Sequence, residues 1–210
     1  MEPIIKEIYQ GILDGTHTRM PANVQSALEA GLTPKVIMDE GMIAAMAEVG
    51  RLFEAGEFYV PEMLISARAM QAGLAVLKPH LKETNVQAAG KVAIGTVKGD
   101  LHDIGKNLVA MVLEGAGFEI LDLGTDVPAE KFVAAADEVD IIALSGLLTT
   151  TIPGMRSVIQ ALEQAHKRDK IKVIVGGAPV TESFAAQIGA DGYAPNASRA
   201  VALTKALLAG

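Results

Sequence analysis

The sequence KVAIGTVKGDLHDIGKN, residues 91–107, contains three successive patterns. Its first seven residues, Lys91–Val97, form a short β-rich run, which predicts a buried strand. The next six residues (98–103) are mostly polar and include a glycine, which predicts a loop. Apolar residues then recur at helical spacing from Ile104 to about residue 116, which predicts a helix. A strand, a loop and a helix in this order are the repeating unit of a parallel α/β sheet.

The same alternation continues to the C-terminal end of the sequence. Further strands are predicted at 118–123, 140–145 and 171–175, with a weak fifth near 192–194. Helices are predicted between and after them, at about 128–138, 153–167, 181–188 and 197–208. This spacing predicts a doubly wound, flavodoxin-like α/β domain over residues 91–210, with five parallel strands and right-handed crossovers. In such sheets ligands bind beyond the carboxyl ends of the strands.

Before residue 85 the hydrophobic period is helical throughout. Helices are predicted at about 4–14, 21–30, 34–53 and 61–81. Four helices with short connections predict a small antiparallel bundle over residues 1–85. Residues 83–90 lose the periodicity, and we expect them to link the bundle to the α/β domain.

Composition excludes several classes of site. The 210 residues contain no cysteine, which excludes a disulfide scaffold, a thiolate zinc site, an iron–sulfur cluster and a cysteine nucleophile. Only four histidines are present, and the net charge of −7 argues against nucleic-acid binding. The N-terminal residues lack the pattern of a signal peptide, and no apolar run is long enough to suggest a membrane span. We therefore expect a cytoplasmic protein with no membrane and no nucleic-acid partner.

The loop after the first strand fails the common phosphate-binding patterns. A dinucleotide fingerprint would need glycine where Leu101 stands. A P-loop would need glycine at Asp100 and a hydroxyl residue at Asn107. A phosphorylatable receiver would need an aspartate at the end of the third strand, where Ser145 stands. Flavin binding would need a Ser/Thr-rich phosphate loop and flanking aromatic residues, which this segment lacks.

Two interpretations of His102 remain open. In one, Asp103 caps the helix that begins at Ile104, and His102 is a solvated loop residue. In the other, Asp100 hydrogen-bonds one nitrogen of the His102 ring, which fixes the tautomer and makes the other nitrogen a better metal ligand. One histidine is too few to hold a bare transition metal, but it suits a metal whose equatorial ligands come from a macrocycle.

Two other strand ends carry matching signals. Ser145 ends the third strand and a run of hydroxyls, Thr149, Thr150 and Thr151, follows it. The pair Gly176-Gly177 ends the fourth strand; it either turns the chain or lets a flat group lie between sheet and helix. Together with His102, these features predict a slot with one axial ligand.

These three elements resemble a known signature, that of the cobalamin-binding family whose members replace the cofactor's own base with a histidine. The signature is D-x-H-x-x-G, S-x-L and G-G, which here stands at Asp100–Gly105, Ser145–Leu147 and Gly176–Gly177. The spacers of 39 and 28 residues (106–144 and 148–175) match the family's habit. Residues 98–107 resemble the methionine-synthase branch. The segment Val49–Pro61 resembles the last two helices of the four-helix cap that precedes this domain in methyl-carrying corrinoid proteins.

The resemblance implies specific roles. His102 would be the lower axial ligand of the metal, cobalt, with Asp100 hydrogen-bonded to its other nitrogen and Thr151 continuing the relay. Cofactor-binding positions would be Gly99, Asp100, Leu101, His102, Asp103, Ile104 and Gly105 after the first strand; Ser145, Leu147, Thr149 and Thr150 after the third; and Gly176, Gly177, Tyr193, Ala194 and Asn196 near the nucleotide tail. In the cap, Phe53 and Val60 would cover the methyl group, although Val60 stands where the family has a leucine.

The resemblance also implies a function, that of a free-standing corrinoid subunit in a methanol, methylamine or O-demethylase type of methyltransferase system. Such a subunit binds cobalamin or a related corrinoid base-off and histidine-on. It carries a methyl group, with methylcobalamin as intermediate and cobalt cycling between Co(I) and methyl-Co(III). Its partners are a substrate-specific methyltransferase, a second, acceptor-side methyltransferase and a reductive activase, and it is not catalytic alone.

Three other interpretations are weighed against the methyl carrier. A radical mutase subunit would need a barrel partner and no cap, so the helical half argues against it. A cobalamin-binding sensor or regulator would be expected to add a DNA-binding domain. A flavodoxin-like interaction domain without cofactor is the third.

Overall fold

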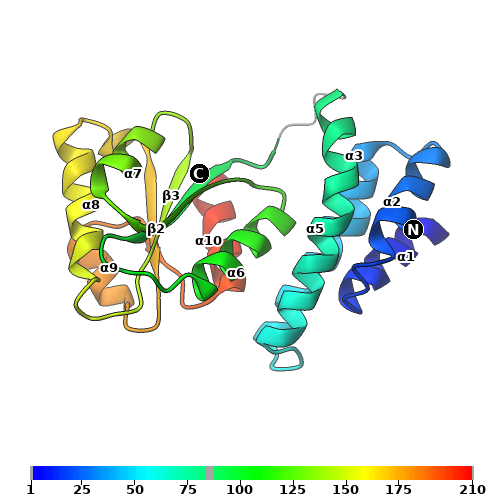
Figure 1. Cartoon of the computed structure of the whole chain (residues 1–210), viewed down its shortest axis with the longest axis horizontal. Helices are drawn as coiled ribbons and strands as arrows, with labels where there is room; N and C mark the ends of the chain where they lie inside the picture. Colours follow the sequence, from blue (N-terminus) through cyan, green and yellow to red (C-terminus); the bar gives the residue numbers. More distant parts are fainter. Residues whose placement is uncertain (1, 84–87, 210) are drawn as a thin grey trace. The chain divides into compact units, whose positions relative to one another are not determined.

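A computed structural model describes residues 2–83 and 88–209. The chain divides into two compact units (Figure 1). The first contains the residues up to Ala88 together with Glu114–Gly117, and the second contains Ala89–Leu113 and the residues from Phe118 onward. Part of the predicted linker, residues 84–87, lies outside the described residues. In the described part of the chain no helix is long and apolar enough to cross a membrane.

The first unit is helical. Its elements are α1 (Pro3–Leu13), α2 (Met20–Glu29), α3 (Pro34–Val36), η1 (Ile37–Ile43), α4 (Ala44–Glu54) and α5 (Val60–Glu83). Helix α1 packs against α2, η1, α4 and α5 through a buried stripe of Ile5, Ile8 and Ile12. Because α3, η1 and α4 follow one another without a break, they form one continuous helix. The unit therefore contains the four helices that the periodicity predicts.

The third helix differs from the prediction in its local geometry. Residues Ile37–Ile43 form a π-helix rather than an α-helix. A π-helix has a longer turn, so an analysis that assumes 3.6 residues per turn does not detect it. Gly41 lies within this segment, and a Cβ there would come within 3.1 Å of Ile8 Cγ2. Glycine therefore lets the π segment approach α1 closely.

The second unit is a parallel sheet with helices on both faces. Its strands are β1 (Lys91–Val97), β2 (Glu119–Val127), β3 (Ile141–Ser145), β4 (Lys172–Gly176) and β5 (Gly192–Tyr193), in the order β2-β1-β3-β4-β5. The helices are α6 (Ile104–Gly115), α7 (Ala129–Ala135), α8 (Pro153–Gln164), η2 (Arg168–Lys170), α9 (Glu182–Ile188) and α10 (Ala197–Ala209). Helices α7, α8 and α9 cover one face and α6 and α10 the other (Figure 1). The predicted doubly wound α/β fold is confirmed.

The central strands are buried because both faces of the sheet are covered. All residues of β1 after Lys91 are buried, as are Ile141–Leu144 of β3 and Val173–Val175 of β4. One continuous core lies between the sheet and α7, α8 and α9, with Phe132 fully buried within it. A packed sheet of this kind holds the loops at its carboxyl ends in fixed positions.

Strand β2 is longer than predicted. The apolar pattern predicts an end at Leu123, but the strand continues to Val127. Its register against β1 shifts twice, because Ile94 pairs with Asp122, Gly95 with Gly124 and Val97 with Val127. At each shift β2 contains an extra residue that has no partner in β1, which is a β-bulge, and regular pairing resumes after it. Bulges depend on the neighbouring strand, so the local sequence pattern does not reveal them.

Candidate functional site at the carboxyl end of the sheet

The predicted functional residues gather where the chain changes direction across the sheet. Strand β1 lies between β2 and β3, and the helices that follow β1 and β3, α6 and α8, cover opposite faces of the sheet. In doubly wound sheets this arrangement opens a crevice at the carboxyl ends of the two diverging strands. The loop after β1 carries Asp100 and His102, and the loop after β3 carries Thr151.

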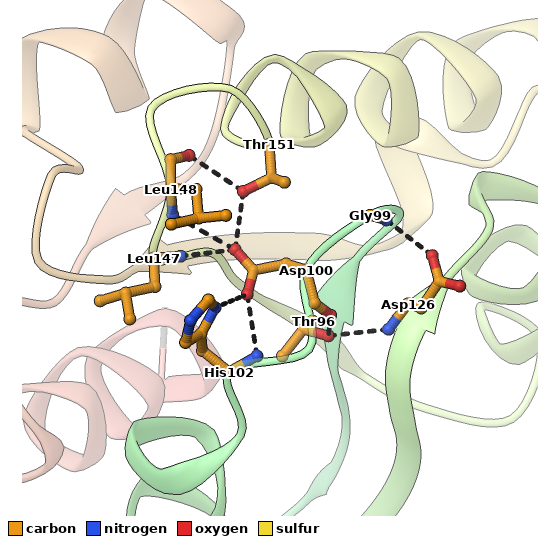
Figure 2. A network of polar contacts seen from close by, with 8 residues as sticks. All are labelled: Thr96, Gly99, Asp100, His102, Asp126, Leu147, Leu148 and Thr151. Carbon is orange, nitrogen blue, oxygen red and sulfur yellow. Dashed lines mark hydrogen bonds and ion pairs between the residues drawn. The ribbon is translucent and has the colours of Figure 1, made fainter.

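The Asp100 carboxylate is fully buried, and one of its oxygens is held by the loop after β3. Oδ2 accepts hydrogen bonds from the Leu147 N–H at 2.7 Å, the Leu148 N–H at 3.3 Å and the Thr151 hydroxyl at 2.6 Å (Figure 2). A charged acceptor with several donors at these distances forms strong hydrogen bonds. Asp100 therefore joins the two loops.

The other oxygen of Asp100 holds His102. Oδ1 accepts the backbone N–H of His102 at 3.0 Å and lies 2.9 Å from Nδ1 of its ring. The residue between them, Leu101, is 70% exposed, so the loop turns Asp100 inward and Leu101 outward. The His102 side chain is 49% exposed, although one edge of its ring is fixed.

This geometry sets the charge of Asp100 and the tautomer of His102. Burial by itself raises the pKa of Asp100. Hydrogen bonds from Thr151, Leu147 and His102 lower the pKa by more than burial raises it, so the pKa is well below the usual range. An ionised carboxylate can only accept hydrogen bonds. Nδ1 of His102 must therefore carry the proton that it shares with Asp100, and in a neutral ring Nε2 keeps a free lone pair.

Thr151 has two acceptors for one proton. Its hydroxyl oxygen lies 2.6 Å from Asp100 Oδ2 and 2.9 Å from the carbonyl oxygen of Leu148. A hydroxyl donates a single hydrogen bond, and the shorter contact is to a charged acceptor. We therefore infer that the Thr151 hydroxyl donates its hydrogen bond to the Asp100 carboxylate. The β3 loop thus contributes a side-chain donor as well as two backbone donors.

Apolar side chains surround His102 at the surface. In the described part of the α/β unit the exposed large apolar side chains are Leu101, Ile104, Leu121, Leu147 and Leu148. Leu101 lies on the loop after β1, Ile104 begins the helix that follows this loop, and Leu147 and Leu148 lie on the loop after β3. Ile104 is 79% exposed at the first position of α6. Exposed apolar side chains gathered on one site indicate that a ligand or partner covers them. The alternative of a merely solvated His102 does not explain this cluster.

Glycines at the fourth strand allow a very close backbone approach. A Cβ on Gly177, whose φ is +136°, would lie 1.9 Å from the carbonyl oxygen of Gly146. A Cβ on Gly176 would lie 3.0 Å from the carbonyl oxygen of Ala194. Gly105 is different, because no atom lies within 4 Å of the place its Cβ would take. The chain itself therefore gives no steric reason for glycine at this position.

Comparison with known proteins identifies the family. Residues 90–202 match the family model described as "B12 binding domain", and residues 4–78 match a second model with the same description. The chain is 43% identical to dimethylamine corrinoid protein 2 of Methanosarcina acetivorans, over 100% of this chain and 98% of that protein. The chain belongs to the B12-binding family of corrinoid proteins. This confirms the resemblance inferred from the sequence.

Other B12-binding relatives agree over the whole length. Trimethylamine corrinoid protein 1 of Methanosarcina acetivorans is 41% identical over 99% of this chain and 98% of that protein. Among solved structures, the methanol:cobalamin methyltransferase complex of Methanosarcina barkeri contains a chain with a TM-score of 0.88 and 30% identity, covering 100% of this chain and 81% of that one. A cobalamin-binding protein of Desulfitobacterium hafniense DCB-2 has a TM-score of 0.79 and 32% identity over 97% and 98%.

The residues present fit a corrinoid. Such a cofactor brings most of the ligands of its cobalt itself, so His102 would be enough as the protein's contribution. Among the described residues no group of three or more His, Cys, Asp or Glu side chains could hold a metal ion by itself. The open space at Gly105 and the exposed apolar side chains beside His102 suit a flat, partly apolar ring.

Other predicted site residues lie around the same edge. Ser145 ends β3 beside Gly176, and Thr149 and Thr150 are exposed in the loop that follows β3. Asp103 directly precedes α6 and accepts a hydrogen bond from the Asn107 side chain at 3.0 Å. Tyr193 packs on the core and Ala194 is buried. Asn196 Oδ1 caps α10 by accepting the Arg199 N–H at 2.8 Å.

Two predicted residues belong to the helical unit. Phe53 is half-buried in α4, and Val60, 44% exposed, begins α5. Tyr59, beside Val60, is also exposed, so this turn presents apolar side chains to the surface. A role for Phe53 and Val60 above the cofactor stays a prediction.

Sequence reasoning missed two residues of the network. Asp126 of β2 accepts the Gly99 N–H at 2.6 Å, and the buried Thr96 of β1 donates to the carbonyl oxygen of Asp100 at 2.6 Å (Figure 2). Thr96 is a polar residue in a strand that is otherwise apolar after Lys91, and this was a visible signal. Asp126 gave none, because its position depends on the bulges of β2.

Proposed function

We propose that this chain is a corrinoid-binding methyl carrier of a methyltransferase system. The observation that carries the proposal is the pair of Asp100 and His102 at the carboxyl edge of the sheet. Asp100 is buried and ionised, it fixes the tautomer of His102, and it leaves Nε2 of a half-exposed ring free to bind a metal. The bound corrinoid would supply the chemistry through a cobalt that cycles between Co(I) and methyl-Co(III).

His102 is the proposed lower axial ligand, in a base-off and histidine-on mode of binding. Asp100 orients the ring and would stabilise a positive charge on it if Nε2 took up a proton after release from the metal. Thr151 and the N–H groups of Leu147 and Leu148 hold Asp100 in place, so the ring orientation does not depend on the cofactor. The imidazole of His102 is thus already oriented to bind a metal before the cofactor arrives.

The edge formed by β3, β4 and β5 is the proposed place of the nucleotide tail. Gly176 and Gly177 lack side chains where the backbones of the β3 and β4 loops approach each other. Ser145, Thr149 and Thr150 offer hydroxyl groups nearby, while Ala194 keeps the outer end small. The side-chain oxygen of Asn196 already caps α10, so its proposed contact would use the remaining amide group.

The helical unit is proposed to cover the upper face of the corrinoid. Co(I) is readily oxidised, and an apolar lid excludes water and oxidants from the metal. Phe53 and Val60 are the proposed lid residues, and the exposed Tyr59 beside them suits a surface that meets a ligand. The unit would have to move aside for partner enzymes, and residues 83–90 are the proposed hinge segment.

The proposed partners are a substrate-specific methyltransferase, an acceptor-side methyltransferase and a reductive activase, all in the cytoplasm. The relatives named for dimethylamine and trimethylamine are 43% and 41% identical, whereas the chain from the methanol complex is 30% identical. These values favour a methylated amine as the methyl donor. The chain is proposed to be a carrier, with the reactions catalysed by its partners.

The proposal is tested by binding hydroxycobalamin to the purified protein and to its His102→Ala variant. The wild-type protein should show, at neutral pH, the absorbance spectrum of a cobalamin whose own base is replaced by an axial imidazole of the protein. The variant should fold with unchanged circular dichroism and lack that spectrum. Identical spectra for the two proteins would refute the axial role of His102.

A further inference from the structure

Strand β2 departs from regular geometry beside the loop that carries Asp100. Two β2 residues, Thr125 and Asp126, stand opposite the single β1 residue Thr96, which defines a bulge. Asp126 has a φ of +52°, which is uncommon for a residue with a side chain. Glycine would adopt this conformation without strain, and Gly124 does so two residues earlier with a φ of +89°. The side chain of Asp126 must therefore contribute something that offsets the strain.

The contacts of Asp126 show what that contribution is. Its Oδ1 accepts the Gly99 N–H at 2.6 Å, and its own N–H approaches two oxygens at 2.9 Å, the Thr96 hydroxyl and the Asp100 carbonyl. The Thr96 hydroxyl in turn donates to the Asp100 carbonyl at 2.6 Å. Figure 2 shows the bonds of Asp126 to Gly99 and to Thr96 beside Asp100.

Asp100 is therefore held at two places, its carboxylate and its backbone. Its carboxylate is fixed by the loop after β3, while its backbone is fixed by Thr96 of β1 and Asp126 of β2. His102 follows only two residues later and is bonded to the same carboxylate. A shift of the Gly99–Asp100 backbone would carry the imidazole with it, so the position of Nε2 depends on both anchors.

We propose that Asp126, acting with Thr96, is a positioning residue for the metal-binding histidine. It does not touch the cofactor; it fixes the backbone from which Asp100 orients His102. The inference rests on the proposed function, because it assigns His102 as the axial ligand. Its physical content is a brace of four hydrogen bonds among Thr96, Gly99, Asp100 and Asp126, which we call the β2 brace.

Two pairs of substitutions distinguish the effect of losing the β2 brace on His102 from a general loss of protein stability. Asp126→Gly removes the carboxylate and relieves the backbone strain, whereas Asp126→Asn keeps an oxygen that can accept the Gly99 N–H. Thr96→Val removes the hydroxyl at constant shape, and Thr96→Ser retains it. Asp137→Asn is the matched control, because Asp137 is an exposed aspartate with an ion pair to Lys167 elsewhere in the same unit.

Two independent measurements test the variants: the binding of hydroxycobalamin, and the ¹⁵N shifts of the His102 ring in the cofactor-free protein. In Asp126→Gly and Thr96→Val we expect the Kd for hydroxycobalamin to rise roughly 10-fold and the histidine-ligated fraction to fall, as for other second-layer residues of metal sites. Asp126→Asn, Thr96→Ser and Asp137→Asn should stay within about 2-fold of wild type. The ¹⁵N shifts of the His102 ring in cofactor-free protein should show a fixed Nδ1–H tautomer in wild type and tautomer averaging in Asp126→Gly.

The outcomes distinguish the two proposals. A wild-type protein without a histidine-ligated spectrum would refute the proposed function, while the ring ¹⁵N shifts would still test the β2 brace. A wild-type Kd, ligated fraction and tautomer in Asp126→Gly would overturn the β2 brace while leaving the proposed function intact. If Asp126→Gly does not fold, the same comparison of Thr96→Val with Thr96→Ser decides the question.

Discussion

The two halves of the site at the carboxyl edge are built by opposite means. On the side of β1 the position of His102 is set by side chains, with a buried carboxylate that accepts five hydrogen bonds. On the side of β4 the geometry is set by missing side chains, because Gly177 comes against the Gly146 carbonyl oxygen where no Cβ would fit. Substitutions can remove the hydrogen bonds of Asp100 one at a time, whereas any side chain at Gly177 would clash with the backbone. The following predictions test this difference.

The steric side should give the largest effect. Gly177→Ala would place a Cβ 1.9 Å from the Gly146 oxygen at a φ of +136°, so the backbone must move. We expect the free energy of unfolding of the cofactor-free protein to fall by about 4 kcal/mol, from strain and overpacking together. Urea unfolding measures this, with Gly105→Ala as the control. An unfolding free energy of Gly177→Ala equal to that of Gly105→Ala would contradict the steric account.

The polar side should give the next largest effect on stability. Asp100→Ala leaves the N–H groups of Leu147 and His102 without their acceptor, whereas the Thr151 hydroxyl can still donate to the Leu148 carbonyl oxygen at 2.9 Å. We expect a loss of about 3 kcal/mol in the free energy of unfolding, since each orphaned donor is costly. A double variant, Asp100→Ala with Thr151→Val, should lose less than the sum of the two single variants, because both single changes remove the same Thr151–Asp100 bond. Losses that simply add would argue against that bond.

Acid should weaken the polar side selectively. The folded pKa of Asp100 lies below its unfolded value of about 3.9, so its stabilisation is complete above that pH and is lost as the pH falls toward the folded pKa. Wild type should exceed Asp100→Asn in the free energy of unfolding near pH 7, and the difference should shrink near pH 3. Denaturant titrations at both pH values measure it. A difference that stays constant or grows in acid would refute the depressed pKa.

Gly105 should give the smallest effect on the fold. Its Cβ would meet no atom within 4 Å, and alanine is the better helix former. We expect the unfolding free energy of the cofactor-free Gly105→Ala protein to rise by about 0.5 kcal/mol or stay unchanged. Equilibrium titration should nevertheless show weaker binding of hydroxycobalamin. Unchanged binding would show that the ligand does not cover Gly105.

The sequence was most informative where chemistry is local. Strand β1 was predicted with its observed ends, Lys91 and Val97, because a buried parallel strand is a continuous apolar run. The separation of two residues at a strand end allowed the pairing of Asp100 with His102 as one of two interpretations, and the family resemblance favoured it. Thr151, 51 positions from Asp100 along the chain, was reached only through the family resemblance.

What escaped prediction depends on neighbours in space. The π segment Ile37–Ile43 and the bulges of β2 both break the regular periods on which pattern analysis relies. Asp126 gained its role from such a bulge, since the shifted register brings it to Thr96 and Gly99. Its own sequence context, Thr125-Asp126-Val127, resembles the beginning of an ordinary loop.

The origin of the axial ligand is the central claim, and isotope labelling tests it directly. Protein labelled with ¹⁵N-histidine is loaded with cobalamin, reduced to the Co(II) state and examined by electron paramagnetic resonance. An axial ¹⁴N splits each cobalt line into three, whereas an axial ¹⁵N splits it into two. We predict two-line splitting in the labelled protein and its disappearance in His102→Ala. Three-line splitting in the labelled protein would show that the cofactor's own base remains bound, and it would contradict the account.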